Sequence, residues 1–213
     1  EPEIKFWGSD RDILLGNLTM KDRIVNFLYN RKFFNTYNLN DGKFDELISL
    51  NNSFKPVSYW AYVDAMEKFA KYINENNKEV FSPKMIVTTI GPLYPEARKE
   101  IEKAFKTKVF NQYGSREMGW VAFENEKDLE VCFWRQVVEL EGRDEEKDLI
   151  ITSLDNYAMP LIRYKIGDVA TEGDFFKINE VKSYLTLGNV LGRTLGFFKL
   201  KDGSLKHTHF IVQ

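Results

Sequence analysis

The stretch KMIVTTIGPLYPEARKEIEKAFKTKVFNQYGSREMG, residues 84–119, decides the predicted fold. It begins with an uncharged run rich in β-branched side chains, residues 85–90, which favours a buried strand. Pro95 suits the first position of a helix, and the apolar side chains of residues 95–105 recur at helical spacing. Residues 108–113 then predict a second strand. A strand, a helix and a strand in so short a span predict a βαβ unit, whose two strands are parallel neighbours.

Residues able to bind or polarise a ligand follow directly on the second strand. They are Tyr113, Gly114, Ser115, Arg116 and Glu117. Open α/β sheets usually hold their ligands just beyond the carboxyl ends of the strands. An aromatic ring, a glycine turn, a hydroxyl, a guanidinium and a carboxylate at such a place therefore predict a binding site.

The region before the βαβ unit predicts helices. Residues 43–51, KFDELISLN, indicate a short helix, and the stretch of residues 54–77 indicates a long one that Ser58 can cap. The long helix would carry an apolar stripe at helical spacing. The stripe consists of Tyr59, Tyr62, Val63, Met66, Phe69, Ala70 and Ile73. It could line a pocket, but a stripe of this kind more often packs into a core.

The region after Gly119 has a different character. Short β-like runs are separated by Gly, Asp and Asn turns, and no helical pattern interrupts them. The runs are residues 129–140, 148–154, 160–171 and 182–188. They predict an antiparallel subdomain that resembles a barrel or a sandwich.

The predicted fold class is therefore α/β: a mixed, largely parallel sheet flanked by helices, followed by a β-rich, barrel-like subdomain. The predicted divisions are an α/β part in residues 1–122, a β-rich part in residues 123–192, and a final part in residues 193–213.

Composition excludes several classes of protein. The 30 basic and 32 acidic residues are scattered over 213 positions, and no basic stripe predicts a nucleic-acid partner. A single cysteine, Cys132, excludes an internal disulfide framework and fits a reducing compartment. No apolar run approaches the ~20 residues that span a bilayer, and EPEIKFWGSD at the N-terminus has no signal-peptide pattern. The chain is predicted to be cytoplasmic without a membrane segment, and its composition carries no signal for an oligomeric state.

Three segments in order carry a family resemblance. They are TTIGPLYPEAR with VFNQYGSREMG, then LIITSLDNYAMPLIRYKIGDVA, then VLGRTLGFFKLKDG. Together they resemble the adenylate-forming acyl- and aryl-CoA ligases, and within these the phenylacetate-CoA ligases and the CapK-like proteins of capsule biosynthesis. The likeness extends upstream through residues 34–50 and 54–73. It implies part of the large domain of such a ligase, with residues 1–122 as its nucleotide-binding subdomain. It also implies the ATP-dependent activation of a small carboxylic acid as an acyl-adenylate, with transfer to coenzyme A or another acceptor.

The resemblance implies a place for adenine. The ring of Tyr113 would stack on one face of the base and the turn at Gly91 and Pro92 would lie on the other, with Gly114 and Ser115 completing the nucleotide site. A glycine turn allows a close backbone approach, and an aromatic ring offers a stacking surface. From its position alone, Tyr113 is equally compatible with a core aromatic at a strand end.

The resemblance also implies that Glu117 holds Mg²⁺, which prefers one or two carboxylates together with phosphate oxygens. The alternative is that Glu117 is a solvated or helix-initiating acid. Most family members have Ser or Thr directly before this glutamate, where this chain has Arg116. A guanidinium could bind the phosphate in a bidentate manner, or it could form an ion pair with Glu117 and block the metal.

The resemblance further implies that Asp168, in RYKIGD, and Arg193, in LGR, bind the ribose. An ionised carboxylate accepts from two hydroxyls at once, and a guanidinium can donate to the same sugar. An aspartate after a glycine is otherwise a common turn residue, and only the preceding MPLIRY makes Asp168 a predicted ligand. Arg163 and Tyr164 are predicted to belong to the wall of the β-rich part.

Two parts of the family pattern are missing. No Ser/Thr/Gly-rich phosphate loop occurs in residues 1–80, and residues 194–196 lack the acidic hinge that family members have after the arginine. The C-terminal domain with its catalytic lysine would follow residue 213. The chain is therefore expected to be the central piece of a longer enzyme, containing a hinge and the start of a truncated C-terminal domain, and to be inactive by itself.

A different class of function remains open. A CapK-like protein could retain the fold and serve as a non-catalytic binding or scaffold component in surface-polysaccharide assembly. Arg116, Leu195 and the missing loop favour this alternative. The Tyr113–Gly114 pair, Glu117, Asp168 and Arg193 favour the ligase.

Overall fold

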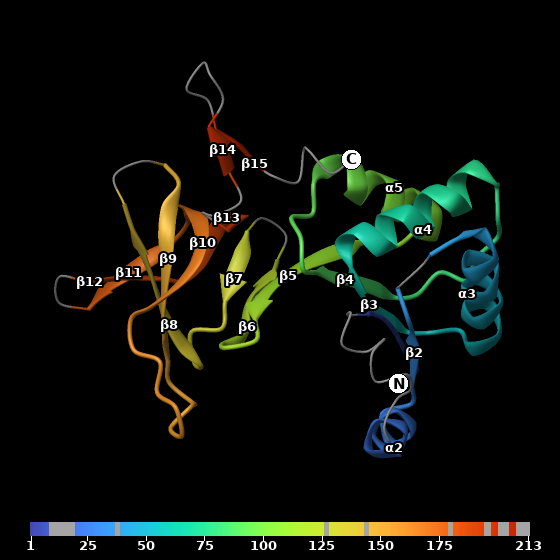
Figure 1. Cartoon of the computed structure of the whole chain (residues 1–213), viewed down its shortest axis with the longest axis horizontal. Coiled ribbons are helices and arrows are strands. Elements are labelled where there is room, and N and C mark those ends of the chain that lie inside the picture. The colour runs from blue at the N-terminus through green and yellow to red at the C-terminus, as the bar shows by residue number, and fades with distance from the viewer. Residues whose placement is uncertain are drawn as a thin grey trace. The chain divides into compact units, whose positions relative to one another are not determined.

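The computed structural model describes most of the chain, which forms two compact units, Glu1–Asn111 and Gln112–Gln213 (Figure 1). The sequence had placed the division at residue 122 instead. Residues 194–196, where the hinge was expected, lie outside the described residues. The described residues are 1–8, 20–36, 39–125, 128–142, 145–178, 181–193, 197–199 and 205–207.

The first unit contains a parallel sheet with helices. Its strands hydrogen-bond in the order β2-β1-β3-β4-β5, and each neighbouring pair is parallel. The strands are β1 (Glu3–Phe6), β2 (Arg31–Phe34), β3 (Ser58–Tyr62), β4 (Met85–Thr89) and the first residues of β5 (Val109–Ser115). The described helices are α2 (Met20–Leu28), α3 (Asp41–Phe54), α4 (Val63–Glu75) and α5 (Pro95–Phe105).

The predicted βαβ unit is confirmed. β4 and β5 are parallel neighbours, with Ile86 opposite Val109. Helix α5 begins at Pro95, where the fixed φ of proline and its missing N–H suit the first helical turn. Its buried face consists of Ala97, Ile101, Ala104 and Phe105, the residues that the helical spacing picks out.

The helix predicted within residues 54–77, with Ser58 as its cap, is wrong at its start. Residues 58–62 form strand β3, which lies between β1 and β4, and the helix begins only at Val63. In SYWAY the side chains of Tyr59 and Ala61 are buried while their neighbours are half-buried, which is the alternation of a strand. Aromatic residues are also favoured in strands. The alternation of buried side chains in residues 58–62 could therefore be mistaken for part of a helical stripe.

Aromatic rings form much of the core of the first unit. The ring of Phe69 on α4 is fully buried and lies 5.5 Å from Phe44, 6.0 Å from Phe6 and 5.7 Å from Phe105, measured between ring centroids. The apolar stripe of α4 is therefore core rather than pocket lining. None of the described helices combines the length and the apolar character that crossing a membrane requires.

The second unit consists of antiparallel strands, and no helix occurs among its described residues. The main ladder runs β5-β6-β7-β13-β10-β9-β8, beginning with the last residues of β5. Its other strands are β6 (Gly119–Glu124), β7 (Leu129–Val131), β8 (Gln136–Glu141), β9 (Lys147–Ser153), β10 (Tyr164–Glu172) and β13 (Thr186–Arg193). Two separate hairpins are β11 (Phe175–Ile178) with β12 (Val181–Tyr184), and β14 (Phe197–Lys199) with β15 (Leu205–His207).

The α/β fold class with a mixed sheet and flanking helices is confirmed, since the described ladders form one eleven-stranded order. No closed barrel forms among the described residues of the β-rich part. Within the described residues β8 pairs only with β9, so the ladder has an open edge. The predicted run 129–140 is also two strands, because a turn at residues 132–135 separates β7 from β8. Cys132 in this turn is buried, and burial raises the pKa of its thiol, as expected for a packing residue.

Candidate functional site

The turn between β5 and β6 carries the charged residues predicted for phosphate and metal. The Oγ atom of Ser115 accepts a hydrogen bond of 3.1 Å from the backbone N–H of Met118. This bond spans the turn, so Arg116 and Glu117 occupy its two central positions, and both are exposed. The Ser115 hydroxyl thus has a structural partner in addition to the ligand role that the sequence predicts.

Gly114 allows the two strands to approach each other closely. A Cβ atom at this position would lie 2.3 Å from the carbonyl oxygen of Gly119 and 2.8 Å from Nε2 of Gln112. The β5–β6 register is irregular between Tyr113 and Gly114, as in a β-bulge. The protein's own backbone therefore requires glycine here, a structural role separate from the predicted contact of Gly114 with the nucleotide.

Two of the predicted nucleotide ligands are in direct contact. The hydroxyl of Tyr113 donates a hydrogen bond of 2.6 Å to Oδ2 of Asp168, although 55 positions separate the two residues. The interaction is partly buried, and Tyr113 packs against the hydrophobic core of the second unit. Tyr113 therefore has both a packing role and a polar partner at the predicted site.

The backbone of β10 presents Asp168. Pairing with β9 is regular up to Lys165 and resumes at Val169, and the intervening residues bulge out of the ladder. Gly167 in this bulge has a φ of 88°, a conformation that side chains other than glycine rarely adopt. On the other edge of β10, Asp168 lies opposite Arg193 of β13. The structure thus brings three of the predicted positions together, Tyr113, Asp168 and the backbone of Arg193.

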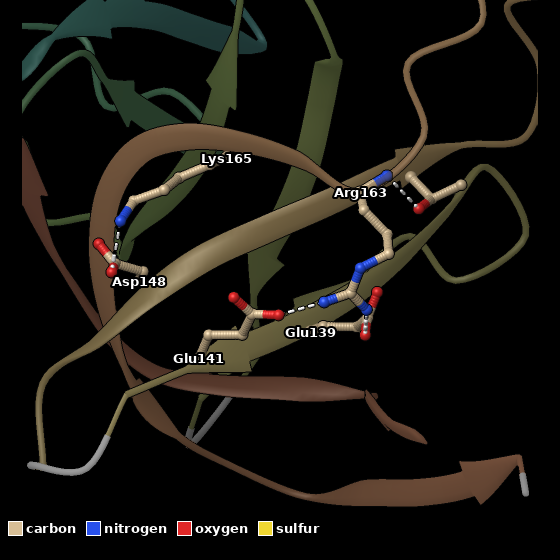
Figure 2. A network of polar contacts seen from close by, with 6 residues as sticks. Glu139, Glu141, Asp148, Arg163 and Lys165 are labelled. Carbon is tan, nitrogen blue, oxygen red and sulfur yellow. Dashed lines mark hydrogen bonds and ion pairs between the residues drawn. The ribbon is translucent and has the colours of Figure 1, made fainter. Parts of the chain in front are cut away.

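An ion-pair network holds the start of β10 (Figure 2). The guanidinium of Arg163 pairs with the carboxylates of Glu139 and Glu141, which lie on β8. The backbone N–H of Arg163 donates to Oγ1 of Thr152 at 2.9 Å. These contacts give Arg163 a structural role in anchoring the strand that carries Asp168.

Another ion pair lies on β10 itself. Lys165 pairs with Asp148 of β9 at 2.6 Å (Figure 2). Exposed pairs of this kind contribute little individually, about 0–1 kcal/mol each. Asp148 lies opposite Val169 in the ladder, so the pair with Lys165 spans the bulge that contains Gly167.

The predicted adenine turn belongs to the first unit. Gly91 and Pro92 follow β4, but the unusual backbone angle falls on Ile90, whose φ is 59°. A Cβ added to Gly91 would meet only Val63, at an ordinary distance of 3.5 Å. A β-branched residue with positive φ is strained, and such strain is often found at functional sites. No sequence pattern predicts this backbone angle, because Ile90 is typical of the last residue of a buried strand.

Within the described residues, no three His, Cys, Asp or Glu side chains gather as a metal-binding group. A single exposed carboxylate, Glu117, is nevertheless compatible with Mg²⁺, which takes one or two protein carboxylates and completes its shell with phosphate and water oxygens.

Comparison with known proteins identifies the fold. No family model matches the sequence. The chain is 29% identical over 176 residues to Protein CapK of Staphylococcus aureus, an alignment that covers 81% of this chain and 39% of CapK. A solved structure of 2-hydroxyisobutyryl-CoA ligase in complex with R3-HIB-AMP matches 97% of this chain and 46% of its own, with a TM-score of 0.68 and 16% identity. The chain has the fold of the acyl-CoA and aryl-CoA ligases.

A second ligase supports the same conclusion. An anthranilate CoA ligase in complex with anthranoyl-AMP matches 80% of this chain and 36% of its own, with a TM-score of 0.55 and 11% identity. The resemblance to acyl- and aryl-CoA ligases and to CapK is thereby confirmed. The chain spans about two-fifths of CapK and less than half of these ligases, so the ligase fold seen here is only part of such a protein.

Proposed function

We propose that this chain is the AMP-binding core of a cytoplasmic enzyme that activates a carboxylic acid as an acyl-adenylate and transfers the acyl group to coenzyme A or another acceptor. The observation that carries the proposal is the hydrogen bond between Tyr113 and Asp168, with Arg193 opposite Asp168 in the sheet. Residues from all three resembling segments thus meet within one unit. The acyl-AMP ligands of the similar ligases support the proposal.

The proposed contacts bind the ribose and the adenine of the nucleotide. The Asp168 carboxylate accepts hydrogen bonds from the ribose hydroxyls and Arg193 donates to the same sugar. The ring of Tyr113 stacks on one face of adenine. Gly114, together with Tyr113, shapes the pocket edge.

The turn after β5 is proposed to bind the phosphates. Arg116 neutralises phosphate charge and Ser115 contributes its hydroxyl. Glu117 is the residue that would hold Mg²⁺, which supplies further neutralisation of charge when it is bound. Residues 1–80 contain no phosphate loop, and backbone donors of that kind are a large part of transition-state stabilisation. We therefore expect this chain alone to bind nucleotide without forming an adenylate at a useful rate.

Replacing Asp168 with alanine is expected to weaken AMP binding by about 2 kcal/mol, or roughly thirtyfold, because the ribose hydroxyls lose a charged acceptor. Isothermal titration of the 213-residue chain with AMP measures the effect. Asp174, an exposed aspartate just after β10, provides the matched control. Asp174→Ala should leave the affinity unchanged, whereas wild-type affinity in Asp168→Ala would overturn the ribose assignment.

The Arg116→Thr variant restores the residue type usual in the family. If Arg116 binds phosphate, affinity for AMP should fall about tenfold while affinity for adenosine, which has no phosphate, stays constant. Tighter binding of ATP with Mg²⁺ in the variant would show instead that Arg116 blocks Glu117. A folded wild-type chain that binds neither AMP nor an acyl-adenylate mimic more tightly than about 1 mM would favour the non-catalytic binding component.

A further inference from the structure

The bond between Tyr113 and Asp168 is of a strong type. A donor–acceptor distance of 2.6 Å lies in the range of charge-assisted hydrogen bonds from a hydroxyl to a carboxylate. Its partial burial limits competition from water.

Both partners are held by their own strands. The ring of Tyr113 packs against the core of the second unit, next to the close approach of β5 and β6 at Gly114. Asp168 follows the bulge at Gly167 and is paired on its other edge with Arg193. Because neither backbone can turn freely, the hydrogen bond selects one orientation of the Asp168 carboxylate.

We propose that the Tyr113 hydroxyl is a positioning group that holds the Asp168 carboxylate ready for the ribose hydroxyls, and thereby makes the site selective for ribonucleotides. The inference rests on the proposed function. The ring and the hydroxyl of Tyr113 then have separate tasks, since the ring contacts the base and the hydroxyl acts through Asp168. An aspartate fixed beforehand loses no rotamer freedom when the sugar binds, which favours nucleotides that have both hydroxyls.

The test compares AMP with 2′,3′-dideoxyadenosine monophosphate, which retains the base and the phosphate but has neither ribose hydroxyl. Tyr113→Phe keeps the ring and removes only the hydroxyl. We expect the wild-type chain to prefer AMP, and Tyr113→Phe to lose about tenfold in AMP affinity while dideoxy-AMP binding changes by less than about twofold. In Asp168→Asn the further change Tyr113→Phe should have little additional effect, because the two residues act as a unit.

The chain offers a matched control on the same strand. The hydroxyl of Tyr184 donates to Glu172 of β10 at 2.7 Å, and hydrogen bonds from Lys147 and Tyr184 lower the pKa of the Glu172 carboxyl to about 2. Tyr184→Phe therefore removes the same kind of bond away from Asp168. It should lower stability without changing the ratio of AMP affinity to dideoxy-AMP affinity.

Each result decides a different question. If Tyr113→Phe keeps the wild-type preference for AMP, or loses affinity for both nucleotides equally, the positioning role is overturned while the proposed nucleotide site stands. If Tyr184→Phe changes the preference as much as Tyr113→Phe does, the effect is one of general stability and the inference fails. If the folded wild-type chain binds neither nucleotide, the proposed function is overturned and the inference with it.

Discussion

Replacing Gly114 with alanine is expected to destabilise the second unit by about 3 kcal/mol. A Cβ atom would stand 2.3 Å from the carbonyl oxygen of Gly119, and this neighbour is backbone that cannot rotate away. The strands β5 and β6 would have to separate or change register. Hydrogen exchange measured on peptides from residues 109–124 should accelerate by roughly a hundredfold.

Gly91 provides the control for this prediction, because it is also a predicted site glycine. Its Cβ would make only an ordinary contact of 3.5 Å with Val63. Gly91→Ala should therefore fold with wild-type stability, and any loss of AMP affinity in this variant would reflect the nucleotide site alone. Wild-type exchange rates in Gly114→Ala would contradict the close approach of β5 and β6.

Replacing Phe69 with alanine is expected to destabilise the first unit by about 4 kcal/mol. The ring is fully buried and contacts Phe6, Phe44 and Phe105, which come from β1, α3 and α5. Its removal leaves a cavity between the sheet and the helices. Exchange of amides in β3 and β4 should accelerate by roughly a thousandfold, because 4 kcal/mol corresponds to about that ratio.

An exposed phenylalanine provides the control variant for Phe69→Ala. Phe27 on α2 is 84% exposed, and Phe27→Ala should change stability by less than about 0.5 kcal/mol. If Phe69→Ala also proves mild, the aromatic cluster is not the centre of the first core. Such a result would favour the alternative that the apolar stripe on α4 lines a pocket.

The sequence alone predicts the turn after β5, but it does not predict the contact between Tyr113 and Asp168. The turn with Arg116 and Glu117 followed from its place after a strand, and Pro95 located α5. The contact of Tyr113 with Asp168 could not be derived from spacing, because it depends on how strands far apart in the sequence are ordered in the sheet. The strain at Ile90 contradicts its own residue type, so no local rule could have located it.

The sequence by itself determined the local units of this protein. Proline at a helix start, β-branched runs and glycine turns act over a few residues, so β4, α5 and β5 were read correctly. The tertiary structure alone decided that residues 58–62 are a strand, because their pairing with β1 and β4 outweighs an apparent helical stripe. It also decided that the bulge at Gly167 points Asp168 toward Tyr113, since pairing partners separated by tens of residues are set by the packing of the whole sheet and not by local propensity.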